Sequence, residues 1–293
     1  MKKINLKAFS LVELSFSLVI IGVMIAGIVG GGVLIKKSKL ATAQSLTKDS
    51  PVASTPDLRL WAETSLSSAV KLNSSNTIST QWSDINPQSK IKQNLTSASA
   101  TTGYTTGYSE EIINDLPALN FNSGNYFLIP NSKVLTNSSY TIFLVEKPSA
   151  PSGVSGDTLV HFTNGAKTDS AGAAATPLEL LYNYTAASAR YTTLKHLNSN
   201  LSFSYNYQVG SANIHTIKYN KTSDISYYWL NGGLAADASS SGGNLTNCYE
   251  TYFGGGSYRG YISEFILFTR SLTDEERQDI ETYLSKKYAI KLS

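Results

Sequence analysis

The stretch Gly260-Tyr261-Ile262-Ser263-Glu264-Phe265-Ile266-Leu267-Phe268 is apolar on both faces when it is read as a β-strand, which is typical of a strand in a sheet that is covered on two sides. Tyr140–Val145 has the same pattern. Leu201–Val209 alternates apolar with polar residues, and this period of two predicts a strand with one buried face. Residues 57–293 therefore favour many antiparallel strands and a β-sandwich.

A tight turn and a helix complete this pattern. Ile225–Leu230 is followed by Asn231-Gly232-Gly233, and Asn-Gly accepts the positive φ angles of a type I′ hairpin turn. Near the C-terminus, Thr273 and Glu276 have the spacing of a capping box. The helix that they begin is expected to bury one stripe of side chains, namely Ile280, Tyr283, Leu284 and Tyr288. It is also expected to place Lys286 and Lys287 near its negative end.

The strand and helix at the C-terminus resemble the end of laminin-G-like, concanavalin A-like domains. Earlier segments occur in the order of that family: Leu60-Trp61-Ala62, Trp82-Ser83-Asp84, Pro117–Asn122 and Trp229-Leu230-Asn231-Gly232. The resemblance covers nearly all of residues 57–293 and implies a two-sheet antiparallel jelly roll. The predicted fold is thus mainly β, a jelly-roll sandwich with a C-terminal helix, preceded by a long N-terminal hydrophobic α-helix. Such a fold hosts lectins, adhesive modules and glycosidases, so it says little about function.

The composition excludes several classes of protein. One cysteine, Cys248, rules out an intrachain disulfide scaffold and a site of several thiolates. The first 49 residues hold seven Lys against Glu13 and Asp49, whereas the rest of the chain has 17 basic and 19 acidic side chains. A nearly neutral globular part argues against a nucleic-acid partner, because phosphate binding needs clustered basic residues.

The N-terminal segment predicts a membrane helix. Leu14–Ile35 contains 22 residues without a charge, which as a helix span about 33 Å, the thickness of a bilayer core. The helix is expected to continue to Lys48 and to end at Asp49-Ser50-Pro51, and residues 50–56 to form a stiff linker. A cleavable secretory signal is the alternative, because Ala41-Thr42-Ala43 has the form of a signal-peptidase site.

The segment Lys7-Ala8-Phe9-Ser10-Leu11-Val12-Glu13-Leu14 resembles the processing site of type IV prepilins and pseudopilins. The resemblance implies that a prepilin peptidase removes residues 1–8, cutting between Ala8 and Phe9, and methylates Phe9. It also implies that Glu13 pairs with the terminal amine of a neighbouring subunit, since a lone carboxylate in an apolar helix is costly. That family usually has Gly where Ala8 stands, and a hydrated, unpaired Glu13 is the alternative. The predicted divisions are a leader (1–8), an assembly helix (9–49), a linker (50–56) and a sandwich (57–293).

Aromatic residues in turn-rich segments are the candidate ligand site. Sugars stack on such rings, and the candidates are Tyr104, Tyr108, Tyr249, Tyr252 and Tyr258. The alternative is that these tyrosines belong to the core or the sheet surface. Calcium is left open, because Asp84, Asp157, Asp169 and Asp237 fall in loop-like stretches without forming a dense ligand loop. No metal ligand and no cofactor is predicted.

No catalytic pattern stands out. Catalytic relatives of the fold place alternating carboxylates on one strand, and no such run occurs; Glu110 and Glu111 are adjacent and are expected on opposite faces. Three histidines, His161, His196 and His215, are far apart in the sequence. The chain is therefore predicted not to be an enzyme.

The predicted function is that of a pilin-like subunit, a minor pilin, pseudopilin or adhesin, that displays a lectin-like domain. Its expected partners are other pilin-like subunits, a prepilin peptidase, the inner membrane and a glycan. The expected location is the bacterial inner membrane before assembly, with the sandwich in the periplasm or on an extracellular filament. Two alternatives stay open: a signal-anchored periplasmic binding protein, and a glycan-cleaving enzyme.

Overall fold

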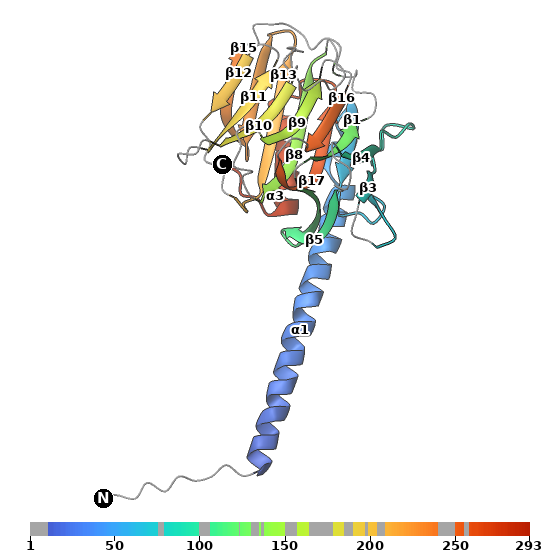
Figure 1. Ribbon diagram of the computed structural model, residues 1–293, viewed down its shortest axis with the longest axis vertical. Helices are drawn as coiled ribbons and strands as arrows, with labels where there is room; N and C mark the ends of the chain where they lie inside the picture. Colours follow the sequence, from blue (N-terminus) through green and yellow to red (C-terminus); the bar gives the residue numbers. More distant parts are fainter. Residues whose placement is uncertain are drawn as a thin grey trace, which may run out of the picture.

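The computed structural model describes residues 11–75, 79–99, 106–122, 124–129, 135, 138–149, 157–163, 178–184, 190–196, 199–203, 209–239, 250–254 and 258–293. A 38-residue helix, α1 (Leu11–Lys48), opens this part of the chain. Its first half projects away from the β-domain, and its second half lies against that domain (Figure 1).

The helix α1 ends just before Asp49-Ser50-Pro51, as predicted, because proline disfavours a helical conformation in the residue before it. Pro51 then begins the short helix α2 (Pro51–Ser54). Val52 is fully buried, so the segment that was expected to be a linker packs into the domain.

Large apolar side chains on α1 are exposed to solvent, namely Leu14, Phe16, Leu18, Val19, Ile20, Ile21, Val23, Met24, Ile25, Val33, Leu34 and Ile35. Among the residues that the structure describes, however, no helix has both the length and the apolar character needed to cross a membrane. This finding contradicts the predicted location in an inner membrane, and the periplasmic or extracellular placement that depended on it is not retained.

The β-domain contains two sheets in which every described pair of strands is antiparallel. The first sheet has the order β15 (Gly233–Ser239), β14 (Ile225–Leu230), β13 (Asn213–Asn220), β8 (Tyr140–Pro148), β17 (Arg259–Phe268), β6 (Leu116–Asn122) and β5 (Gly107–Ile113), and β1 (Leu58–Glu63) also pairs with β17. The second sheet has the order β12 (Ser199–Phe203), β11 (Arg190–His196), β10 (Leu178–Tyr184), β9 (Asp157–Thr163), β16 (Glu250–Gly254), β7 (Asn125–Ile129), β4 (Leu95–Ser99), β3 (Ser79–Trp82) and β2 (Val70–Leu72).

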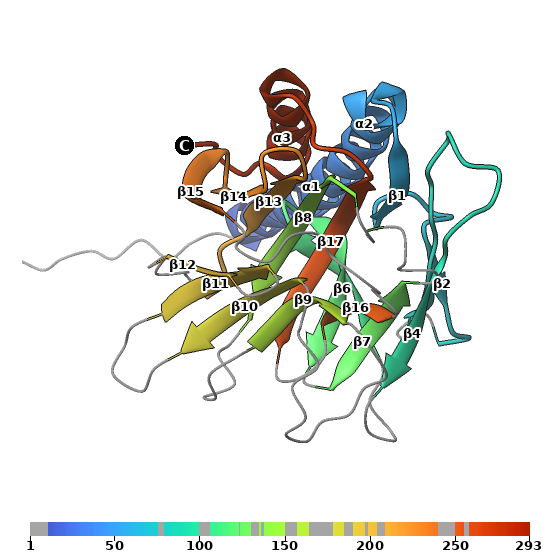
Figure 2. The same ribbon diagram turned by 90° about the horizontal axis from the view of Figure 1, so that it is seen from above.

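The elements form three layers, in which the first sheet lies between the second sheet and the helices (Figure 2). On β17, Phe265 and Leu267 face the core between the sheets, whereas Ile266 and Phe268 face a second core beneath the helices. The strand is therefore covered on both sides, as its continuous apolar sequence predicted.

The predicted hairpin and C-terminal helix are both confirmed. β14 pairs with β15, and the turn residues Asn231 and Gly232 have φ angles of 49° and 80°, which are the positive values of a type I′ turn. The helix α3 (Asp274–Tyr288) has Thr273 as its N-cap and the complete capping box with Glu276.

The mainly β, antiparallel fold with a C-terminal helix is thus confirmed, while the jelly-roll connectivity stays a prediction. The alternating segment Leu201–Val209 lies partly in β12, and its residues 204–208 fall outside the described part of the chain.

Candidate functional site

A groove of about 310 Å³ lies between the second half of α1 on one side and β5, the turn that follows it and the start of β6 on the other. Its helix wall consists of Val33, Lys36, Lys37 and Leu40, and its strand wall of Tyr108, Glu110, Glu111, Asp115 and Pro117. A groove that combines an aromatic ring, apolar side chains and a few polar groups is the usual form of a small-ligand site.

Glu110 and Glu111 both line this groove. The expectation that these neighbours point to opposite faces is wrong, because it assumed a regular strand. Glu111 has a φ angle of 81°, and the register between β5 and β6 shifts between Ser109 and Ile113. Such a bulge breaks the alternation of side chains and redirects one of them.

Two ion pairs join α1 to the strand wall of the groove. Lys36 Nζ lies 2.6 Å from Glu111 Oε2, and Lys39 Nζ lies 2.5 Å from Asp115 Oδ2. The hydrogen bond from Lys39 lowers the pKa of Asp115, so Asp115 is ionised at neutral pH. The side chains of all four residues are partly exposed, so both ion pairs are in contact with solvent.

Tyr108 is the aromatic residue of the groove. Its side chain is partly buried and packs against the core between the sheets. Burial, followed by the nearby charges of Glu110 and Glu63, raises the pKa of Tyr108 to about 12. Its hydroxyl is therefore neutral and able to donate a hydrogen bond at physiological pH.

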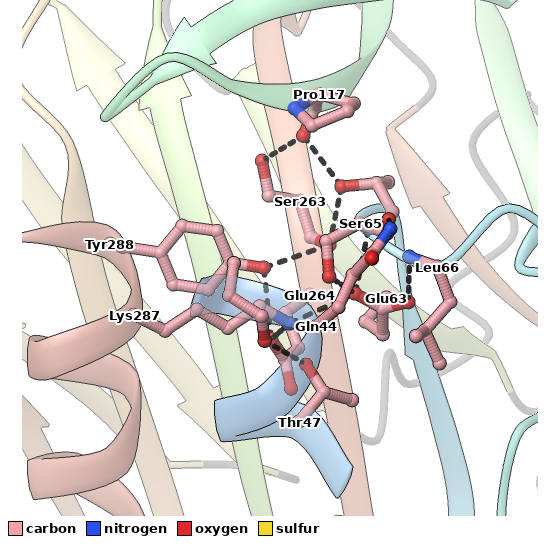
Figure 3. A network of polar contacts seen from close by, with 12 residues as sticks. Gln44, Thr47, Glu63, Ser65, Leu66, Pro117, Ser263, Glu264, Lys287 and Tyr288 are labelled. Atoms are coloured by element: carbon pink, nitrogen blue, oxygen red, sulfur yellow. Dashed lines mark hydrogen bonds and ion pairs between the residues drawn. The ribbon is translucent and has the colours of Figure 1, made fainter. Parts of the chain in front are cut away.

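Behind this groove lies a fully buried ion network made of Glu63, Glu264 and Lys287 (Figure 3). Lys287 Nζ lies 2.9 Å from Glu63 Oε2 and 2.8 Å from Glu264 Oε2. Burial alone lowers the pKa of Lys287, but the two carboxylates outweigh it and hold the pKa well above its ordinary value. Burial likewise raises the pKa of Glu63, yet the charge of Lys287 and hydrogen bonds from Ser65, Lys287 and Leu66 bring it below the ordinary value.

The network satisfies the carboxylates with neutral donors as well. Glu264 accepts hydrogen bonds of 2.8–2.9 Å from Trp61 Nε1 and from the hydroxyls of Tyr283 and Tyr288. The backbone N–H groups of Ser65 and Leu66 donate to Glu63. These donors stabilise two carboxylates that share one ammonium group.

The same network touches both α1 and the groove. Gln44 Nε2 donates to the Ser65 carbonyl at 2.9 Å, and the Thr47 and Tyr283 hydroxyls are 3.4 Å apart. On the other side, the carbonyl of Pro117, a residue of the groove, accepts a hydrogen bond from Ser263 Oγ (Figure 3). The buried network thus fixes the helix and the strand wall relative to each other.

The other candidate tyrosines have different positions. Tyr258 is 1% exposed and donates a hydrogen bond to Glu146 Oε2 at 3.0 Å, so its ring belongs to the core and offers no face to a sugar. Tyr104, Tyr249, Ala8 and Phe9 lie outside the described residues. For Tyr252 and Glu13 the structure describes the backbone but not the side chain.

No metal centre emerges from the described part of the chain, where no three His, Cys, Asp or Glu residues gather closely enough to hold an ion. Asp84 instead accepts hydrogen bonds from the N–H groups of Trp61, Asn86 and Gln93, which orders the loop after β3. His215 is buried between Glu146 and Tyr228. Asp169 and Cys248 lie outside the described residues.

Reasoning from the sequence missed the buried network. Lys287 was assigned to the negative end of α3, and Glu63 and Glu264 were not singled out. One signal was available: Glu264 is the single charged residue within the apolar run Tyr261–Phe268, and a buried carboxylate requires a partner.

No family model matches the chain, and neither does any curated protein. Solved structures do share its fold. A sialidase variant from Trypanosoma rangeli with trans-sialidase activity has 15% sequence identity and a TM-score of 0.56, with 90% of this chain and 40% of that chain covered. A GH54 α-L-arabinofuranosidase has 11% identity and a TM-score of 0.54, with 72% and 52% covered.

The chain thus spans about half or less of the length of these structures. They lend no support to the predicted pilin-like segment. They are enzymes, which contradicts the prediction that the chain is not an enzyme. At this level of identity the likeness concerns the fold: the chain shares a β-fold with proteins that act on carbohydrates.

Proposed function

We propose that this chain recognises a glycan in the groove between α1 and β5. The proposal is carried by Tyr108, whose aromatic side chain lines the groove on the same wall as the carboxylates of Glu110, Glu111 and Asp115. A sugar presents C–H groups on its face and hydroxyls at its edge, so one ring and several acceptors satisfy both kinds of group. The shared fold with carbohydrate-active proteins supports the same ligand class.

The test is a glycan array probed with the full chain, followed by calorimetry on the sugars that bind. Changing Tyr108→Ala is expected to weaken binding about tenfold or more, because a central aromatic contact contributes 1.4 kcal/mol or more. Tyr126→Ala, at a half-buried tyrosine of β7 in the other sheet, is the matched control and should bind normally. Absence of binding to every sugar, or full binding by Tyr108→Ala, would contradict the proposal.

A second function, glycan cleavage, is favoured by the bulge that brings Glu110 and Glu111 into one groove. Hydrolysis of a glycosidic bond requires two carboxyl groups near the scissile bond. The wild-type chain is then expected to release reducing ends from a sugar that binds on the array. The rate of release should fall at least a hundredfold in Glu110→Gln and in Glu111→Gln, the usual scale for loss of a general acid or base. A wild-type chain that binds the sugar but releases no product would leave recognition without cleavage.

We further propose that the β-domain is a concanavalin A-like jelly roll and that a pilin-like subunit displays it. The exposed apolar side chains of α1 support association with the helices of further copies, since such a surface favours burial. Mass spectrometry of the mature chain tests it: loss of residues 1–8 with a methylated Phe9 is expected. An intact Met1, or assembly that is unaffected by Glu13→Gln, would count against it.

A further inference from the structure

The charge of the groove indicates the class of sugar that it takes. Glu110 is exposed and lies on the strand wall close to Tyr108. Its carboxylate is one of the charges that raise the pKa of Tyr108. A sugar ring stacked on Tyr108 would therefore have an anionic group beside it.

The remaining charges of the two walls largely cancel. Glu111 is paired with Lys36, and Asp115 with Lys39. Lys37 also lines the groove, but it belongs to the helix wall, opposite Tyr108 and Glu110. The strand wall is thus negative where the aromatic ring lies.

The buried network contributes a further negative charge near Tyr108, that of Glu63. Glu63 and Glu264 share the single ammonium group of Lys287, and all three side chains are at most 1% exposed. Charges in a poorly solvated interior are weakly screened, so their field extends to nearby groups. Glu63 acts on Tyr108 in this way.

We propose that the groove binds a glycan with a protonated amino sugar, whose ring lies on Tyr108 and whose ammonium group meets the Glu110 carboxylate. The inference rests on the proposed glycan binding and adds its ligand class. It also implies that a sugar carboxylate, such as that of sialic acid, is disfavoured at Tyr108, although one of the structures with this fold is a sialidase.

The experiment compares three probes on the full chain by calorimetry at mildly acidic pH: the glucosamine trimer, the N-acetylglucosamine trimer and sialyllactose. The first two share the same backbone and differ in charge. The glucosamine trimer is expected to bind about two- to fivefold more tightly than its acetylated form, the range of a partly exposed ion pair. Sialyllactose is expected to bind more weakly than both.

Three variants locate the effect. Glu110→Gln should abolish the preference for the glucosamine trimer, and Lys37→Gln should increase it. Glu275→Gln, at an exposed position on α3, is the charge-matched control and should change nothing. All three changes are at exposed positions, so the fold is expected to survive them.

The outcomes separate this inference from the proposed function. Equal or tighter binding of the acetylated trimer or of sialyllactose, lost in Tyr108→Ala, would overturn the amino-sugar inference and leave glycan recognition standing. A preference that persists in Glu110→Gln would overturn the inference as well. If none of these probes and no sugar on the array binds, the proposed function fails, and this inference fails with it.

Discussion

Two regions attach α1 to the β-domain through polar contacts, and they differ in their exposure to water. At the groove, Lys36 and Lys39 pair with Glu111 and Asp115, and each side chain is 39–49% exposed. Nearer the end of the helix, Gln44 and Thr47 reach a network whose ionised groups are 0% exposed.

This contrast separates what holds the fold from what is available to a ligand. An exposed ion pair exchanges readily with water, so it contributes little to stability and can rearrange around a ligand. A buried pair cannot lose one partner without leaving a charge that nothing solvates. The network is therefore expected to fix the position of α1, and the groove to tolerate changes in its charges.

The largest expected effect is that of Lys287→Met. The change removes the one ammonium group between Glu63 and Glu264, and loss of one partner of a buried pair costs about 3–5 kcal/mol. Denaturant unfolding of the full chain measures it. Lys286→Met, at the exposed neighbouring position of α3, is the control and should stay within about 0.5 kcal/mol of the wild type.

If Lys287→Met is destabilising because the carboxylates lose their counter-ion, adding Glu63→Gln should recover part of the loss. A double variant that is less stable than Lys287→Met would show instead that packing, not charge, dominates in the network.

An intermediate effect is expected in the pH dependence of stability. The pKa of Glu63 lies below its ordinary value of 4.5 in the folded chain, so the unfolded chain takes up its proton first as the pH falls. Its contribution to stability is present above about pH 4.5 and is lost on acidification through the folded-state pKa. Glu63→Gln should therefore be less stable than the wild type at neutral pH, and the two curves should converge in acid.

The control for this titration is Glu275→Gln at the exposed position on α3. Its stability should follow that of the wild type at every pH. Curves for Glu63→Gln and the wild type that remain parallel down to acid pH would show that Glu63 is not ionised in the folded chain.

The smallest expected effect is that of Lys39→Met at the groove. The pair with Asp115 is partly exposed, and such pairs contribute less than about 1 kcal/mol. Added salt should reduce the difference from the wild type further, because the Debye length falls to about 3 Å at 1 M. If Lys39→Met lowered the free energy of unfolding as much as Lys287→Met does, the exposed and the buried regions would not differ in their contribution to stability.

Much of the fold could be predicted because its signals are local. The capping box of Thr273 and Glu276, the Asn231-Gly232 turn and the apolar run of β17 each depend on residues a few positions apart. The groove could be predicted only in part. Tyr108 was identified from its turn-rich surroundings, whereas Glu111 was placed on the wrong face, since alternation along β5 takes no account of a bulge.

The sequence by itself determined where strands, turns and the C-terminal helix form, because short-range periodicity and capping favour one local conformation. Only the tertiary structure decided which charges are buried together. Lys287 and Glu63 are 224 positions apart, and their pairing depends on α3 packing against the face of the first sheet where β1 and β17 pair. Tertiary structure also built the groove, because one of its walls comes from α1 and the other from β5, the turn that follows it and the start of β6. The sequence shows which side chains are ionisable, but the solvation and the partner of each one follow from packing between distant segments.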